Sequence, residues 1–174
     1  MVAINKRPSA ISGVSASSEA LIQTVYPSIA ATGLGKLLGS LYESLPIRIG
    51  DLKLSNLLFP LPTAPLAAGL FFHLKAFGQV YSLTNRSVRL KAALSPRLFQ
   101  RVPLEEIAEV EVDQKPGQVF YHAADLLLKG TKGNVLAVLA GVPRADVFRQ
   151  SILEARDARV KTVASLATID ARSK

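Results

Sequence analysis

The chain of 174 residues has the length of one domain that can bury a sizeable core. Its composition, 49% hydrophobic, is high for a soluble domain and low for a protein with several membrane spans. It contains no cysteine, which excludes disulfides, thiol catalysis and thiolate metal sites. The net charge of +8 favours an acidic partner. With 6% aromatic residues and no basic block longer than Lys6-Arg7, anionic lipid headgroups fit better than nucleic acid.

Residues 1–18 are rich in Ser, Ala and Gly and predict a disordered arm. Ile11 and Val14 are separated by small polar residues, so no continuous apolar run follows Lys6-Arg7. No export signal is therefore expected.

Residues 19–56 are predicted to form an amphipathic, helical lead-in. Leucines recur near helical spacing from Leu34 to Leu45, which predicts a helix with Lys36 and Glu43 on its polar side. The sequence Gly33-Leu-Gly-Lys36 lacks the spacing of a phosphate-binding loop, and no strand is expected to lead into it.

Residues 57–78 form an apolar segment that predicts membrane association. From Leu57 to Leu74 the chain carries no charged residue and reaches the lower edge of the length that spans a bilayer. Pro60, Pro62 and Pro65 interrupt this run, and proline removes backbone donors. A regular helix is therefore expected only from Pro65 to Phe77, which is short for a full crossing.

Three interpretations of this segment remain open: a monotopic or re-entrant insertion, a single span, and a buried helix of a soluble protein. Cations precede the segment at Arg48 and Lys53 and follow it at Lys75, which favours insertion with both ends in the cytoplasm. The expected location is the cytoplasmic membrane, with the following domain facing the cytoplasm. The candidate membrane contacts are Leu57, Leu58, Phe59, Leu66, Leu70, Phe71, Phe72, Leu74 and Phe77.

From Gln79 onward the pattern predicts short β-strands. Val80–Leu83 and Ser87–Ala92 read as a hairpin around the polar turn Thr84-Asn85-Arg86. Four more strands are expected at Arg97–Val102, Ile107–Asp113, Ala124–Lys129 and Val135–Ala140, the last two as a hairpin. A single helical turn is expected within Pro103–Ile107.

The last element is predicted to be an amphipathic helix that begins at Pro143. Asp146 lies in its first turn, where it complements the helix dipole. The helix carries an apolar stripe of Val147, Phe148, Ile152, Leu153 and Ala155. A row of strands with such a terminal helix is typical of a small, half-open barrel or sandwich whose open end the helix closes.

Five motifs in this part of the chain resemble, in order, those of bacterial pleckstrin-homology (PH) domains of small membrane-associated proteins. They are Tyr81-Ser-Leu-Thr-Asn-Arg86, Val102-Pro-Leu-Glu-Glu-Ile107, Val110-Glu-Val112, Asp125-Leu-Leu-Leu128 and Gly141-Val-Pro143. The resemblance covers Gln79 to Arg159. The chain departs from it at Ala124, where a glycine is common, and in its apolar segment, which is shorter than the usual pair of spans.

The resemblance implies a fold of β-strands with α-helix: a half-open PH-like barrel or sandwich, closed by the C-terminal helix and preceded by the apolar segment. It implies one strand more than the six identified above, expected within Gln118–Ala123. The predicted divisions are an arm (1–18), a lead-in (19–56), the apolar segment (57–78), the PH-like domain (79–160) and a helical or frayed tail (161–174). It also implies membrane association, with binding or scaffolding rather than catalysis.

The residue types do not point to an enzyme, a metal site or a cofactor. His122 and Asp125 are three residues apart on a loop leading into a strand, a spacing that favours structural roles. The carboxylates between Glu105 and Asp113 have the spacing of a solvated strand face. Two separate histidines without cysteine make no zinc or iron site.

Five cations are candidates for binding a lipid headgroup or another anion: Arg86, Arg89, Lys91, Arg97 and Arg101. Alternation places Arg89 and Lys91 on one face, near a turn at Arg86 that is expected on the side of the apolar segment. A solvated basic face without a ligand is the alternative.

The expected function is a non-catalytic binding or scaffolding module at the membrane surface, whose partner is anionic lipid or a protein. The alternative is a soluble, self-assembling protein that buries the apolar segment in a homo-oligomer interface. Nucleic acid is not expected as a partner.

Overall fold

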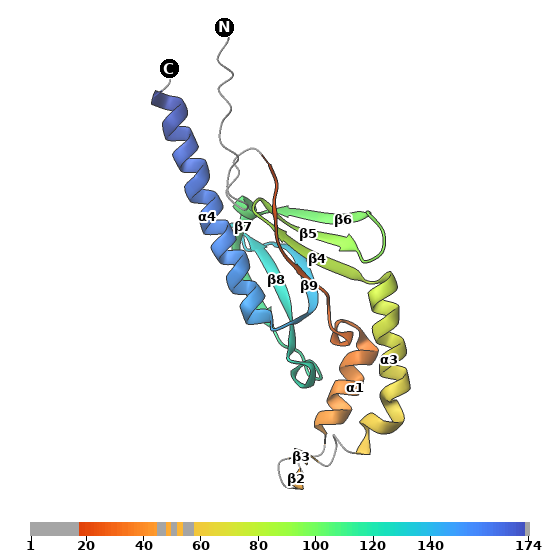
Figure 1. Ribbon diagram of the computed structural model, residues 1–174. Helices are drawn as coiled ribbons and strands as arrows, with labels where there is room; N and C mark the ends of the chain where they lie inside the picture. The colour runs from red at the N-terminus through yellow and green to blue at the C-terminus, as the bar shows by residue number, and fades with distance from the viewer. Residues whose placement is uncertain (1–17, 45–47, 50–51, 54–57, 173–174) are drawn as a thin grey trace.

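The computed structural model describes residues 18–44, 48–49, 52–53 and 58–172 of the chain. Seven strands form two antiparallel sheets, and a long C-terminal helix packs on the second (Figure 1). The first sheet has the order β1 (Leu21–Val25), β4 (Gln79–Thr84), β5 (Ser87–Ala92), β6 (Leu98–Pro103). The second has the order β7 (Ile107–Asp113), β8 (Ala123–Gly130), β9 (Val135–Pro143), and the helix is α4 (Ala145–Arg172). This arrangement confirms the predicted PH-like fold, with sheets that do not close into a barrel.

The core lies between the two sheets and α4. Alternate residues of each strand point inward, among them Leu83 and Val88 from the first sheet and Leu126 from the second. Phe148 and Ile152 of α4 complete this core, and both are almost fully buried. The amphipathic pattern of the last element therefore closes the sandwich as predicted.

The seventh strand of the two sheets, missed by the sequence analysis, is β1; like the short strands β2 and β3, it lies within the segment predicted to be a helical lead-in. Its β-branched residues Ile22, Thr24 and Val25 suit a strand, and it pairs with β4. The expectation of a strand within Gln118–Ala123 was wrong, because Val119–Tyr121 form the 3₁₀ helix η3. The buried Gln118 side chain accepts a hydrogen bond from the Lys115 amide and holds this loop closed.

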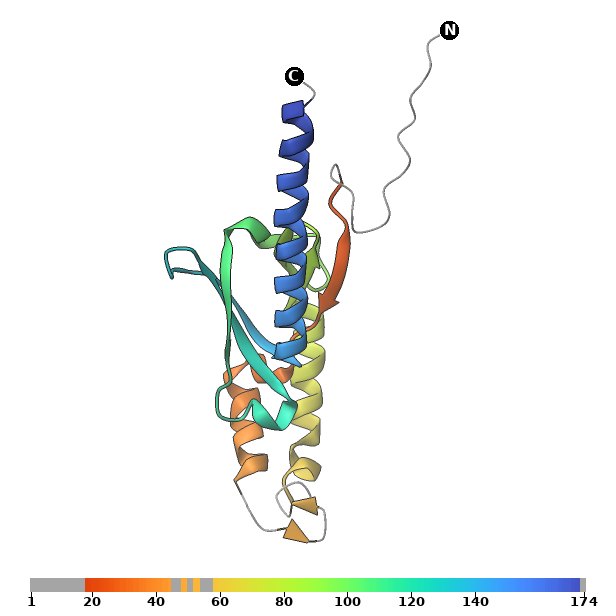
Figure 2. The ribbon, with the colours of Figure 1, turned by 90° about the vertical axis from the view of Figure 1, so that its left-hand side faces the viewer.

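A helical hairpin is inserted between β1 and β4. It contains η1 (Ile29–Ala31), α1 (Gly33–Glu43), the short strands β2 (Arg48–Ile49) and β3 (Leu52–Lys53), and α3 (Pro60–Phe77). Figure 2 shows α1 and α3 side by side below the sheets. The Tyr42 and Thr63 hydroxyls, one from each helix, share a hydrogen bond. The predicted helix at Leu34–Leu45 is confirmed as α1, with slightly earlier bounds.

Glycines let α1 lie directly on the loop before η3. A Cβ at Gly39 would be 1.9 Å from the Gly117 carbonyl oxygen, and one at Gly117 would be 1.9 Å from that of Lys36. Gly117 also has a φ of +78°, which side chains rarely adopt. Backbone therefore packs against backbone here, and the Tyr42 ring packs at a tilt against Phe120 with ring centroids 4.6 Å apart. The hairpin is thus anchored to the second sheet through its loop.

Two predicted helix starts were wrong. The helix α3 begins at Pro60 rather than Pro65, because Pro60 and Pro62 lie in the first turn, where backbone amides have no partner within the helix. Pro143 ends β9, where it pairs with Ala123, and Arg144 adopts a left-handed φ of 49° before α4 begins. The predicted turn after Pro103 is confirmed as η2 (Leu104–Glu106).

Candidate functional site

The helix α3 is apolar on every side but is covered on only one. Lys75 is the only charged residue of the helix, which otherwise consists of Pro, Leu, Ala, Phe and a few small or polar residues. Its inner side contacts α1 and η1, whereas Phe72 and Phe77 are 67% and 76% exposed. A helix that is hydrophobic all round is normally buried in protein or lipid. The outer side of α3 therefore lacks the environment that its composition favours.

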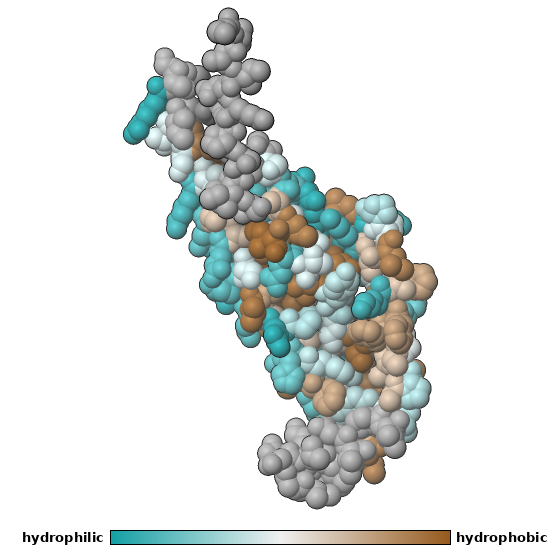
Figure 3. Space-filling model, in the orientation of Figure 1, coloured by the Kyte–Doolittle hydropathy of each residue, from teal (hydrophilic) through white to brown (hydrophobic). Residues whose placement is uncertain are grey.

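The turn between β5 and β6 extends this apolar surface. An open depression of the surface is lined by Phe77 of α3 and by Leu94, Arg97 and Phe99 of the turn and β6. Leu94 is 78% exposed, and Leu98 and Phe99 are also exposed. Figure 3 shows hydrophobic side chains over α3 and also over β1, while mostly hydrophilic residues cover α4. Phe71 and Lys75 lie near Tyr26 and Pro27, on a different side of α3 from Phe77. We call the following set of exposed side chains around α3 and the turn the docking surface: Leu66, Phe71, Phe72, Lys75, Phe77, Leu94, Arg97, Leu98 and Phe99.

Two cations of the docking surface lie over its aromatic rings. The Lys75 ammonium is 5.5 Å from the centre of the Phe71 ring, and the Arg97 guanidinium is 5.3 Å from that of Phe99. Each pair thus combines an apolar body with a positive head at the same point of the surface. Among the helices of the described segments, none has the length and apolar character that crossing a membrane requires.

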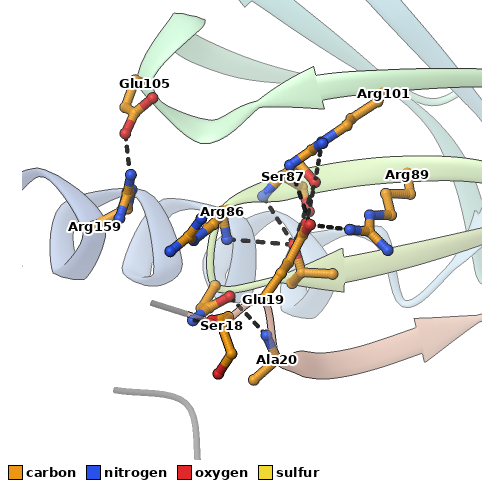
Figure 4. Close-up of polar contacts among 11 residues, drawn as sticks. Ser18, Glu19, Ala20, Arg86, Ser87, Arg89, Arg101, Glu105 and Arg159 are labelled. Carbon is orange, nitrogen blue, oxygen red and sulfur yellow. Dashed lines mark hydrogen bonds and ion pairs between the residues drawn. The ribbon is translucent and has the colours of Figure 1, made fainter. Parts of the chain in front are cut away.

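A polar cluster lies at the end of the first sheet that is farther from α3 (Figure 4). The Glu19 carboxylate accepts hydrogen bonds from the Thr84 and Ser87 hydroxyls, at 2.7 and 2.6 Å. Its other oxygen pairs with Arg89 and with Arg101, the latter at 3.1 Å. Arg89 and Arg101 are direct partners in the β5–β6 ladder, which brings both guanidinium groups to one carboxylate.

These contacts keep Glu19 ionised. Burial would by itself raise its pKa, but the hydrogen bonds from Ser87 and Thr84 and the charges of Arg89 and Arg101 outweigh that effect. The result is a pKa lowered to about 2. Since the folded pKa is depressed, this stabilising contribution is present above the unfolded value of 4.5 and is lost as the pH falls through about 2.

A family model described as Bacterial PH domain matches residues 32–156, well over half of the chain. The chain belongs to this family. No curated protein matches the chain. PH domains are generally non-catalytic modules that bind lipids or proteins, so membership indicates a binding module. The match to this PH domain includes the helical hairpin and the first part of α4, and it begins after β1 and Glu19.

The five predicted anion-binding cations of this PH domain fall into two groups. Arg86, Arg89 and Arg101 lie at the end of the first sheet that carries Glu19. Lys91 lies at the other end, near Arg97 and the end of α3. The turn at Arg86 is therefore not on the side of the apolar segment, because β4 runs its full length between α3 and that turn. Binding by these cations stays a prediction.

The predicted membrane contacts are spread around α3 and its start. Leu58, Leu66, Phe71, Phe72 and Phe77 are exposed, and Phe59, Leu70 and Leu74 are half-buried. Leu57 lies outside the described residues. The sequence analysis missed Leu94 and Phe99, although two large apolar residues in a turn between Lys91 and Arg97 were a usable signal. It also missed Glu19, whose partners are far away in sequence.

Asp125 is a structural carboxylate in the PH domain. It is almost fully buried and accepts hydrogen bonds from the Gln118 side chain at 2.6 Å, the Gly141 amide at 2.8 Å and the Lys115 ammonium at 2.7 Å. Burial would raise its pKa, but these partners and the charge of Lys36 lower it. His122 is exposed, and its backbone, at a φ of 49°, ends η3. Asp125 therefore ties together the helical hairpin and the second sheet.

Proposed function

We propose that this protein is a membrane-surface binding module that sits on anionic lipid through the docking surface. The observation that carries the proposal is the outer side of α3, which exposes phenylalanines on a helix with one charged residue. Transfer of each such side chain out of water is worth about 1.5–3 kcal/mol when it is complete. The proposed location is the cytoplasmic face of the inner membrane, where anionic headgroups attract cations.

The cations of the docking surface support lipid over a purely apolar partner. Lys75 and Arg97 lie over phenylalanine rings, so their heads reach the headgroup level while the rings enter the acyl boundary. Near an anionic surface each cation contributes about 1 kcal/mol.

The charges of the helical hairpin favour docking along its side. Arg48 in β2 and Lys53 in β3 lie in the connection at the tip of the hairpin, between α1 and α3. Insertion with the tip leading would carry these cations into hydrocarbon, which is costly. Contact along α3 and the β5–β6 turn does not require this insertion.

Co-sedimentation with lipid vesicles tests this function. The full chain is expected to pellet with vesicles that contain phosphatidylglycerol and to remain in solution with pure phosphatidylcholine. The double variant Phe72→Ser with Phe77→Ser should bind at least about tenfold more weakly. The control is Val160→Ser, which removes an exposed apolar side chain from α4 and should leave binding unchanged.

The alternative is a self-assembling protein that covers α3 with a second copy of the chain. The exposed Leu34 and Leu37 of the neighbouring helix α1 would enlarge such an interface. Sedimentation velocity separates the two functions. A chain that is monomeric without lipid and pellets with anionic vesicles supports docking, whereas a stable oligomer that ignores vesicles refutes it.

A further inference from the structure

The cluster around Glu19 has the form of an anion-binding site that is already filled. Four donors from three strands of the first sheet converge on one carboxylate: the hydroxyls of Thr84 and Ser87 and the guanidinium groups of Arg89 and Arg101. Hydroxyl and guanidinium donors that meet in this way are typical of sites for phosphate groups. The first sheet positions the donors rigidly, because all four lie on β4, β5 or β6.

Glu19 does not satisfy this site completely. Two guanidinium groups face a single negative charge, so the cluster keeps an excess of positive charge. The Nε atom of Arg89 is buried and has no hydrogen-bond acceptor among the described residues. A phosphate monoester carries a charge of about −1.5 to −2 and three terminal oxygens, which matches these donors better than a carboxylate does.

Glu19, which fills the site, belongs to a different part of the chain from the four donor residues. Thr84, Ser87, Arg89 and Arg101 lie inside the segment that matches the family, whereas Glu19 precedes it. Asn85 holds the segment that carries Glu19 in place: its side chain accepts a hydrogen bond from the Ala20 amide and donates one to the Ser18 carbonyl. The Glu19 side chain is 16% exposed, so the site opens to solvent.

We propose that Thr84, Ser87, Arg89 and Arg101 form a binding site for a phosphate monoester group, and that Glu19 occupies it until such a ligand displaces the carboxylate. Displacement needs only a rotation of the Glu19 side chain, since the Ala20 amide is held by Asn85 independently. Glu19 acts as a built-in competitor and lowers the apparent affinity by the fraction of molecules in which it fills the site. Its low pKa means that protonation does not release it near neutral pH.

The site is separate from the docking surface. The β5 register places Arg89 opposite Ser82 and Arg101, whereas the part of the docking surface on β6 begins at Leu98 and Phe99, and Leu98 pairs with Lys91 near the α3 end of β5. The two sites therefore lie at opposite ends of the first sheet, and each can fail without the other.

Titration with inorganic phosphate at constant ionic strength tests the site, with binding followed by the NMR signal of the Arg89 Nε–H group. The wild-type chain should bind weakly, and Glu19→Gln and Glu19→Ala should bind about tenfold more tightly. The matched control is Glu105→Gln, which removes a carboxylate from the exposed Glu105–Arg159 pair and should not change the affinity.

A pair of arginine variants separates this site from the docking surface. Arg101→Gln should weaken phosphate binding about tenfold and leave vesicle binding unchanged. Arg97→Gln, four residues earlier, should do the reverse. Far-UV circular dichroism verifies that each variant keeps its fold. The proposal is overturned if Glu19→Gln and Glu19→Ala, both folded, bind phosphate no better than wild type, or if Arg97→Gln and Arg101→Gln weaken it equally.

Vesicles distinguish a free phosphate monoester from a lipid headgroup. If the group belongs to a lipid, Glu19→Gln should increase binding to phosphatidic acid more than to phosphatidylglycerol at equal surface charge. If Glu19→Gln improves only the binding of inorganic phosphate, the ligand is a soluble phosphate monoester. Both results require the tighter phosphate binding described above.

Discussion

The two long helices α3 and α4 use their apolar residues in different ways. In α4 most of the predicted apolar stripe is turned inward: Phe148 is 1% exposed and Ile152 is fully buried, although Val147, which the sequence analysis placed in the stripe, is exposed. Its polar residues secure the helix, since Arg149 donates a hydrogen bond to the Val110 carbonyl and Arg156 to that of Ala108. In α3 the three phenylalanines, Phe71, Phe72 and Phe77, are all exposed.

If the proposed function holds, this difference separates residues that stabilise the fold from residues that contact the membrane. The core-facing apolar residues of α4, Phe148 and Ile152, are covered by the sheets, so stability explains them, whereas Val147, Val160 and Val163 of the same helix are exposed. The apolar surface of α3 is covered where it meets α1 and η1. Substitutions of the core-facing residues of α4 should therefore change the free energy of unfolding, and those on the outer side of α3 should change binding.

The largest expected effect is loss of stability when a buried apolar residue of α4 is replaced. Phe148→Ala should lower the free energy of unfolding by about 3–5 kcal/mol, because it leaves a cavity in the core. Val147→Ala, on the exposed side of the same helix, should change it by less than about 0.5 kcal/mol. Urea unfolding monitored by circular dichroism measures both. Similar losses for the two variants would contradict the assignment of the buried side.

A smaller loss is expected where α1 meets the second sheet. Gly39→Ala should cost about 1–3 kcal/mol, because the added methyl group would meet the Gly117 carbonyl. Gly33→Ala has open space around it and should be neutral or slightly stabilising. Thermal unfolding compares the two alanine variants. Equal stability would show that the helical hairpin is not seated on this loop.

The β5–β6 turn should behave like α3 and not like the core. Leu94→Ser should weaken binding to phosphatidylglycerol vesicles by about tenfold, because its exposed side chain would leave water on docking. Its free energy of unfolding should stay within about 0.5 kcal/mol of wild type. Co-sedimentation and urea unfolding of the same preparation measure both quantities. A destabilised variant with unchanged binding would remove the turn from the docking surface.

The smallest expected effect belongs to the cations over the rings. Lys75→Gln should weaken vesicle binding about fivefold, which corresponds to about 1 kcal/mol. Lys161→Gln, on the exposed side of α4, should have no effect if the charge must lie at the docking surface. Co-sedimentation at several salt concentrations compares the two. Equal weakening would indicate attraction by net charge alone.

Local patterns predicted most of the fold. Alternation identified six strands, and leucine spacing identified α1 close to its observed bounds. The strand β1 was not predicted because no turn signal precedes it and because the whole helical hairpin separates it in sequence from its partner β4. The start of α3 was placed too late because proline was read as a helix breaker, although it is tolerated in a first turn.

The docking surface and the Glu19 cluster were harder to predict from the sequence than the fold. The pattern indicated an apolar segment and a basic hairpin, but not that Leu94 joins Phe77 across a turn. Glu19 could not be connected with Arg89 or Arg101, because the contact depends on the pairing of strands distant in sequence. The glycines of α1 looked like helix interruptions, whereas Gly39 allows the close approach to Gly117.

Depth-sensitive labelling tests the central claim, docking through the outer side of α3, most directly. The chain has no native cysteine, so Phe72→Cys, Phe77→Cys and Val160→Cys can each carry one environment-sensitive fluorophore. On anionic vesicles the labels at 72 and 77 should shift to shorter wavelength and brighten, while the label at 160 should stay unchanged. A vesicle-bound chain in which only the label at 160 responds, or all three respond alike, would contradict the account.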